Sequence, residues 1–168
     1  MAIKVTVQTT MTAQLKKVLK DSKEPIDKKT ADKVGETITD MMREVIAKGI
    51  SPIRGVGKFI KYKDPEKYPG KLKAKTPVNL KLDGHFLDGL TFKAVGDKYG
   101  YAAEVFYEKD QEDKERGHRE GGTDKYPDSQ PKRPTIPADA KQQFIRQIED
   151  AYVEILSDRI FQVIKGSG

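Results

Sequence analysis

The sequence of 168 residues has no cysteine, only two histidines and no long apolar run. Without cysteine there is neither a disulfide nor a thiolate ligand, so packing and hydrogen bonds must hold the fold together. No stretch approaches the roughly 18 apolar residues of a membrane span. Residues 3–7 alternate apolar and polar side chains where a signal peptide needs a continuous apolar run. These absences predict a soluble, unexported protein, and a reducing compartment fits them.

The usual signatures of catalysis are lacking as well. No serine lies in a G-x-S-x-G pattern, and Gly55-Val56-Gly57-Lys58 has the spacing of neither a dinucleotide fingerprint nor a P-loop. Two clusters of possible metal ligands have no diagnostic spacing either: Asp83, His85 and Asp88, and Asp113, Glu115, His118 and Glu120. We therefore predict a protein that is not an enzyme and has no cofactor and no metal site.

Positive charge is concentrated in one segment. The formal net charge of the chain is +6, yet residues 52–81 carry nine basic and two acidic residues, a net charge of +7. This excess can face a polyanion or an acidic neighbouring surface, whereas the simpler interpretation is a solvated lysine-rich loop. The charged fraction of 35% is high for a globular domain, and the mean hydropathy of −0.71 is low. Part of the chain should therefore stay solvated unless a neighbouring subunit covers it.

Apolar periodicity predicts the regular elements. Residues 3–7 suit a short strand, and a helix carrying Leu15, Val18 and Leu19 should follow it. A long helix is predicted from Pro25 to Gly49, and residues 80–87 can close a short helical turn. Alternation on both sides of a turn at residues 96–100 predicts an antiparallel hairpin over 90–107. Pro137 is predicted to open a second long helix that ends at Gly166.

Two segments between these elements lack periodicity. Prolines and glycines recur among lysines and aromatics over residues 51–78, while residues 108–120 are almost wholly charged and lead to a proline-rich stretch. We predict one domain over residues 1–168 of the α+β class, a small antiparallel sheet packed against a long N-terminal-half helix and a long C-terminal helix. An extended basic arm (51–78) and a charged, proline-rich arm (108–137) complete it.

Several motifs occur in a recognisable order. Residues Leu80 to Leu90 precede the hairpin, and further along the chain come Tyr101-Ala102, His118, Gly121-Gly122 and Arg133-Pro134. In this order the chain resembles, over residues 26–164, the tail-completion or virion-morphogenesis (neck) proteins of tailed phages. Those proteins have a Leu-x-Thr-Gly-x-Leu-x-x-Ser-Leu segment before the sheet. Asp83 stands here where threonine is usual and can cap the turn as threonine would, and Gly89 stands where serine is usual.

The resemblance implies a structural role in the virion. It implies a small subunit without catalytic activity, assembled in the host cytoplasm as a ring, often of six, in the neck or upper tail. Its partners would be identical copies, the head connector or adaptor, and tail-tube or terminator proteins, with no membrane involved. A tail terminator that caps the tail tube has the same design and is the nearest alternative. A non-specific nucleic-acid-binding protein is an alternative of a different class.

The basic arm supplies the candidate interaction residues. If a ring encloses the DNA path, this arm would line it and contact phosphates without reading sequence. The candidate polyanion contacts are Arg54, Lys58, Lys61 and Lys63. The candidate intersubunit anchors, which a nucleic-acid-binding protein would instead use for stacking, are Phe59, Tyr62 and Tyr68. For Phe59 and Tyr62, anchoring of the arm onto the chain's own core is an equal alternative.

Overall fold

The computed structural model describes residues 26–60, 80, 85–97, 100–121, 132–138 and 142–166. Their elements, in chain order, are α2 (Lys28–Ala47), α3 (His85–Asp88), β1 (Leu90–Asp97), β2 (Gly100–Tyr107), α4 (Lys109–Glu120) and α5 (Arg146–Gly166). This is the predicted α+β class, with an antiparallel pair of strands and two long helices. The predicted strand at 3–7 and the helix after it lie outside the described residues.

The first long helix, α2, forms where the apolar spacing predicts it. The side chain of Asp27 caps its N-terminus by accepting a hydrogen bond from the Thr30 amide at 2.8 Å. Its buried face repeats at helical spacing and includes Val34, Ile38, Met42 and Ile46. Gly49, with φ of 76°, turns the chain away after the helix.

The hairpin of β1 and β2 also follows its alternation. The strands pair antiparallel, with Leu90 opposite Tyr107 and Asp97 opposite Gly100. Tyr107, Val105 and Ala103 are buried on the same face as Leu90. The opposite face is more polar and carries the Lys93–Glu104 ion pair at 3.0 Å. A two-stranded hairpin needs a packing partner to be stable, and here its apolar face contacts α2.

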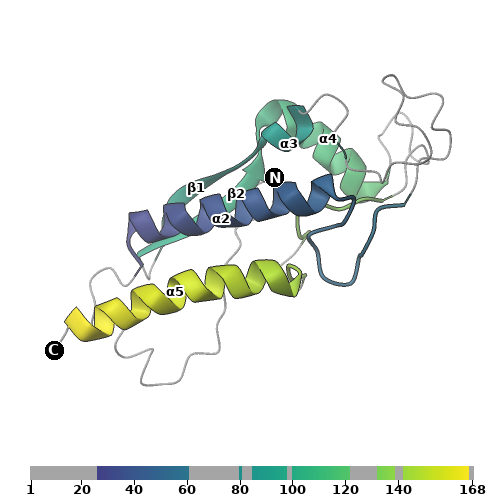
Figure 1. The fold of residues 1–168 in the computed structure, drawn as a ribbon. Helices are drawn as coiled ribbons and strands as arrows, with labels where there is room; N and C mark the ends of the chain where they lie inside the picture. The colour runs from purple at the N-terminus through teal and green to yellow at the C-terminus, as the bar shows by residue number, and fades with distance from the viewer. Residues whose placement is uncertain are drawn as a thin grey trace.

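Helix α2 is the centre of the molecule. It contacts both strands of the hairpin and, elsewhere on its surface, α5, which runs antiparallel beside it (Figure 1). Helices α3 and α4 lie at the open end of the hairpin, away from its turn (Figure 1). Arg159 of α5 pairs with the capping Asp27 of α2 at 3.2 Å, so the second half of α5 is tied to the start of α2.

The C-terminal helix begins at Arg146 rather than at Pro137, which corrects the predicted start. Residues just before it form an extended pairing with the segment after α2. The Ile145 amide donates to the Pro52 carbonyl and the Arg54 amide donates to the Gln143 carbonyl, each at 2.8 Å. The Gln143 carbonyl and the Ile145 amide are therefore bonded to a distant segment, while the Ile145 carbonyl accepts hydrogen bonds from the first turn of α5.

The described parts of the two predicted arms are folded rather than extended. Residues 51–60 bend back on themselves and bury Ser51, Ile53 and Phe59. In the second segment, residues 109–120 form α4, and residues 133–136 pass through the interior with Arg133 fully buried. None of the helices formed by the described residues has the length and apolar character that crossing a bilayer requires.

Candidate functional site

The segment after α2 forms a narrow loop that we call the basic tip and define by Arg54, Val56, Lys58 and Ile60. The Ser51 amide donates to the Gly57 carbonyl at 2.9 Å, and the Phe59 amide donates to the Gly49 carbonyl at 2.8 Å. Gly55 and Gly57 have φ of 86° and 75°, which favours glycine at both positions. All four defining side chains are exposed. The tip therefore presents two cations and two apolar side chains to solvent.

Two of the four predicted polyanion residues lie on this tip. Lys58 is exposed, while Arg54 forms an ion pair with Glu149 of α5 and a hydrogen bond with Gln143. The structure therefore places Arg54 and Lys58 on one loop, but part of the Arg54 charge is neutralised within the chain. Lys61 and Lys63 lie outside the described residues.

The predicted anchor Phe59 belongs to the core of its own chain. Its side chain is 7% exposed and lies in the cluster that includes Met42, Ile46 and Phe144. This burial agrees with the alternative in which Phe59 holds the segment onto its own core, and it makes the ring inaccessible for stacking on a base. Tyr62 and Tyr68 lie outside the described residues.

A second exposed apolar surface lies along α5. Val153, Phe161 and Ile164 fall within about 80° of arc on a helix of 3.6 residues per turn. All three are exposed, Phe161 to 58%. The exposed carboxylates of Asp150, Glu154 and Asp158 lie beside this stripe. We call these six residues the α5 outer face. It combines apolar and acidic side chains.

Sequence reasoning missed the outer face. It predicted one broad apolar face on this helix, of which Tyr152, Ile155 and Leu156 are half-buried against the core, whereas Ile164 of the same predicted face is exposed. The signal that could have revealed a second surface was the position of Phe161, which lies roughly opposite Tyr152 at 100° per residue. Apolar residues on both sides of a helix indicate a second contact.

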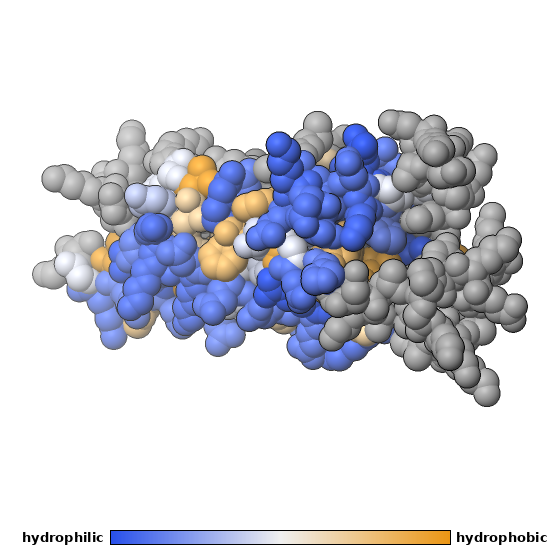
Figure 2. Space-filling view, turned by 90° about the horizontal axis from the view of Figure 1, so that it is seen from above, coloured by the Kyte–Doolittle hydropathy of each residue, from blue (hydrophilic) through white to orange (hydrophobic). Residues whose placement is uncertain are grey.

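Exposed apolar residues are few elsewhere. Seen from above, the described surface is mostly hydrophilic, with small apolar patches between charged side chains (Figure 2). Among the described residues, the exposed large hydrophobics are Val56, Ile60, Val153, Phe161 and Ile164. All of them belong to the basic tip or the α5 outer face.

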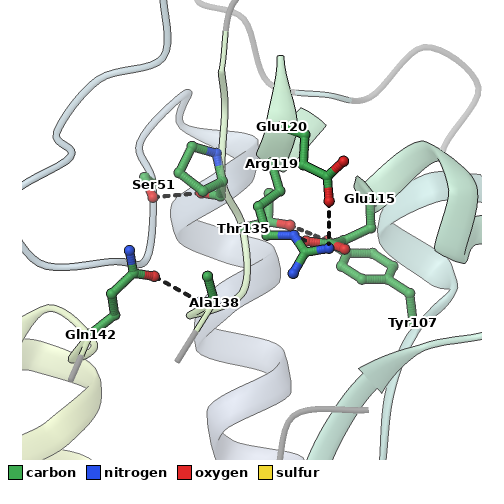
Figure 3. A network of polar contacts seen from close by, with 9 residues as sticks. Ser51, Tyr107, Glu115, Arg119, Glu120, Thr135, Ala138 and Gln142 are labelled. Carbon is green, nitrogen blue, oxygen red and sulfur yellow. Dashed lines mark hydrogen bonds and ion pairs between the residues drawn. The ribbon is translucent and has the colours of Figure 1, made fainter. Parts of the chain in front are cut away.

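A polar cluster, buried or half-buried except for Glu120, lies where α4 meets the hairpin. The Tyr107 hydroxyl lies 3.2 Å from the Thr135 hydroxyl, and Arg119 of α4 contacts Glu115 and Glu120 (Figure 3). Burial raises the pKa of Tyr107 above its usual value, and burial also raises the pKa of Glu115. These shifts follow mainly from loss of solvent, so they indicate a buried structural network.

His118 belongs to this interior. Burial, with the nearby positive charges of Arg133 and Lys114, lowers its pKa to about 4. Its ring meets the edge of the Phe86 ring at a centroid distance of 5.2 Å. The backbone carbonyl of His118 accepts a hydrogen bond from the Arg133 amide at 2.6 Å. His118 is therefore neutral at pH 7 and packs α4 against its neighbours.

Two arginine side chains donate hydrogen bonds to backbone carbonyls of distant segments. Arg43 of α2 donates from Nε to the Leu87 carbonyl at 3.2 Å and from a terminal nitrogen to the Leu90 carbonyl at 2.6 Å. Arg133 donates from Nε to the Ile60 carbonyl at 2.9 Å, and so joins the proline-rich segment to the basic tip. Both guanidinium groups satisfy backbone acceptors at element ends or in irregular segments: Leu87 in α3, Leu90 at the start of β1, and Ile60 in the basic tip.

The described residues bring together no group of three or more histidine or carboxylate side chains that could hold a metal ion. Of the predicted clusters, Asp83 lies outside the described residues. The chain matches no protein-family model, no curated protein and no solved structure in the three comparisons made. Within the described part of the chain, the basic tip and the α5 outer face are the surfaces that expose large apolar side chains.

Proposed function

We propose that this chain is a ring-forming structural subunit of a tailed-phage virion, without catalytic activity, that joins the head connector to the tail. The observation that carries the proposal is the α5 outer face. Exposed apolar side chains along a long helix are costly in a monomer and are characteristic of surfaces that another subunit covers. The order of motifs from Leu80 to Arg133-Pro134 supports the same role by resemblance.

The modest interior supports assembly as well. The core is built by α2, the hairpin, α3, the segments around Phe59 and Ile136, and one face of the C-terminal segment, while much of α5 remains half-buried. Small subunits of this kind gain stability when identical copies bury further surface, and closed rings are a common outcome. The proposal places the protein in the neck or upper tail, with the connector on one side of the ring and tail proteins on the other.

Assembly of the purified full-length chain tests the proposal. We expect sedimentation velocity and native mass spectrometry to reveal a closed oligomer, with six copies as the expected number, and negative-stain images to show rings. A chain that stays monomeric up to millimolar concentration, and that binds neither phage heads nor tails, contradicts the proposal.

The position in the particle is tested separately. A neck subunit should bind DNA-filled, tailless heads, whereas a tail terminator should bind isolated tail tubes. Co-sedimentation of the purified protein with each particle distinguishes the two, and binding to tubes alone would replace the neck assignment by the terminator.

A further inference from the structure

The basic tip contacts α5 near its start, whereas most of the α5 outer face lies further along the helix. Arg54 of the tip pairs with Glu149, one turn into the helix, whereas Phe161 is twelve residues further along. At 1.5 Å per residue these positions are about 18 Å apart along the helix axis. The tip is bonded near the start of α5 and so cannot cover the distal outer face of its own chain.

The two surfaces have opposite charge. On the outer face, Asp150 forms an ion pair with Arg146 at 3.5 Å, so Glu154 and Asp158 supply most of the negative charge. Lys165 lies over the Phe161 ring at 4.5 Å and limits the acidic part of the face to the stretch before Phe161. On the tip, Lys58 supplies positive charge beside Val56 and Ile60, and Lys61 and Lys63 follow directly in sequence.

Like charges disfavour contact between two outer faces. Two copies pairing α5 against α5 would bring Glu154 and Asp158 of each close to the same carboxylates of the other. A surface that offers apolar side chains together with lysine fits the outer face better, because its cations oppose the carboxylates while its apolar groups cover Val153 and Phe161. Among the described residues, the large exposed apolar side chains outside the outer face belong to the basic tip.

We propose that the basic tip of one copy docks on the α5 outer face of the next copy. This inference rests on the proposed function, since it names the contact through which the ring forms. The contact joins two different surfaces, so every copy offers one of each and the chain of contacts propagates head to tail. Closure after a fixed number of copies gives a ring without a separate dimer interface.

Cross-linking tests which surfaces meet, and the cysteine-free sequence makes the experiment specific. One tagged copy carries Val56→Cys on the tip, and a second, differently tagged copy carries Ser157→Cys, an exposed position in the middle of the outer face. With a short bismaleimide we expect a product that contains both tags. Asp113→Cys on α4, whose side chain is 88% exposed, is the control position and should give little product with either partner.

Charge exchange tests the same contact in solution. Lys58→Glu and Asp158→Lys should each raise the dissociation constant for self-association by about three- to tenfold at low salt, and the double variant that carries both should recover most of the loss. Lys109→Glu makes the same charge change as Lys58→Glu at an exposed site on α4, outside both surfaces, and should leave assembly unchanged.

The outcomes separate this inference from the proposed function. If the wild-type chain forms rings but the two cysteine variants give no product joining positions 56 and 157, or link position 157 chiefly to position 157, the docking contact is overturned while the ring-forming role stands. The docking contact is also overturned if neither Lys58→Glu nor Asp158→Lys changes the dissociation constant for self-association. A wild-type chain that never self-associates overturns the ring-forming role itself, and the docking contact with it.

Discussion

The rings of Phe86 and Tyr107 stack with their centroids 4.6 Å apart and their planes 18° from parallel. This contact joins the short helix α3 to the end of β2. The hydroxyl of Tyr107 lies 3.2 Å from that of Thr135 in the proline-rich segment. One buried side chain therefore connects three parts of the chain that are distant in sequence.

Removal of the Tyr107 hydroxyl should measure the polar part of this connection. Tyr107→Phe keeps the stacked ring but leaves the buried Thr135 hydroxyl without this partner, so we expect the free energy of unfolding to fall by about 1–2 kcal/mol. Urea denaturation followed by far-UV circular dichroism gives the value. Tyr101→Phe, at a half-buried position on the same strand, is the matched control and should change stability by less than about 0.5 kcal/mol. Equal losses in the two variants would contradict the role of the Thr135 contact.

His118 should make stability depend on pH. Its pKa is about 4 in the folded protein, below the ordinary value of 6.5. The unfolded chain therefore binds more protons between these values, and stability should be lost as the pH falls from 6.5 toward 4, by at most about 3 kcal/mol. The raised pKa of Glu115 acts in the opposite direction, because the folded state there holds its proton more tightly. The unfolding midpoint in urea at pH 7, 6, 5 and 4.5 measures the slope.

The His118→Gln variant isolates the histidine contribution. Glu115 is present in both proteins, so the difference between the two pH profiles reports on position 118. We expect the variant to lose less stability than the wild type between pH 6.5 and 4.5. Parallel profiles would show that the histidine does not titrate in this range.

Asp27 should stabilise the molecule in two separable ways. It caps α2 through Thr30 and pairs with Arg159, and these contacts hold its pKa below the ordinary value, the Thr30 hydrogen bonds most strongly. Asp27→Ala removes both contacts and should lower the free energy of unfolding by about 1–2 kcal/mol. Asp27→Asn keeps a capping oxygen but not the charge, so it should cost less than about 1 kcal/mol. Thermal unfolding of both variants checks this order, and an asparagine as costly as alanine would assign the effect to the ion pair.

Gly35 should be required where α2 meets the hairpin. A Cβ added at this position would overlap the ring of Phe92. Alanine normally favours a helix over glycine by about 1 kcal/mol, yet overpacking costs about 1–3 kcal/mol, so we expect Gly35→Ala to destabilise the protein. Combining it with Phe92→Leu should recover part of the loss. A Gly35→Ala variant that is more stable than the wild type would show that the ring moves aside freely.

Local pattern was sufficient for the elements whose two sides differ in polarity. The spacing of Val34, Ile38, Met42 and Ile46 predicted α2, and the alternation around Leu90 and Val105 predicted the hairpin, because burial of one face imposes the period of the element on the sequence. The sequence analysis did not predict that Asp27 caps α2, although aspartate is one of the residues preferred at the N-cap of a helix.

The candidate site was less accessible to such reasoning. Arg54 and Lys58 were identified from charge alone, but the ion pair of Arg54 with Glu149 joins residues 95 positions apart. The exposure of Phe161 depends on which side of α5 meets α2. Neither property has a local signature, because each is decided by a partner elsewhere in the chain.

The amino-acid order alone was enough to specify the α+β class, the central helix, the hairpin and the existence of a long C-terminal helix. Three-dimensional packing placed Phe59 and Arg133 in the interior, moved the start of α5 to Arg146 and left Val153 and Phe161 exposed. The reason is physical. Periodicity records which side of an element is buried, whereas the fate of an irregular segment depends on which distant backbone and side-chain groups satisfy its hydrogen bonds and cover its apolar surface.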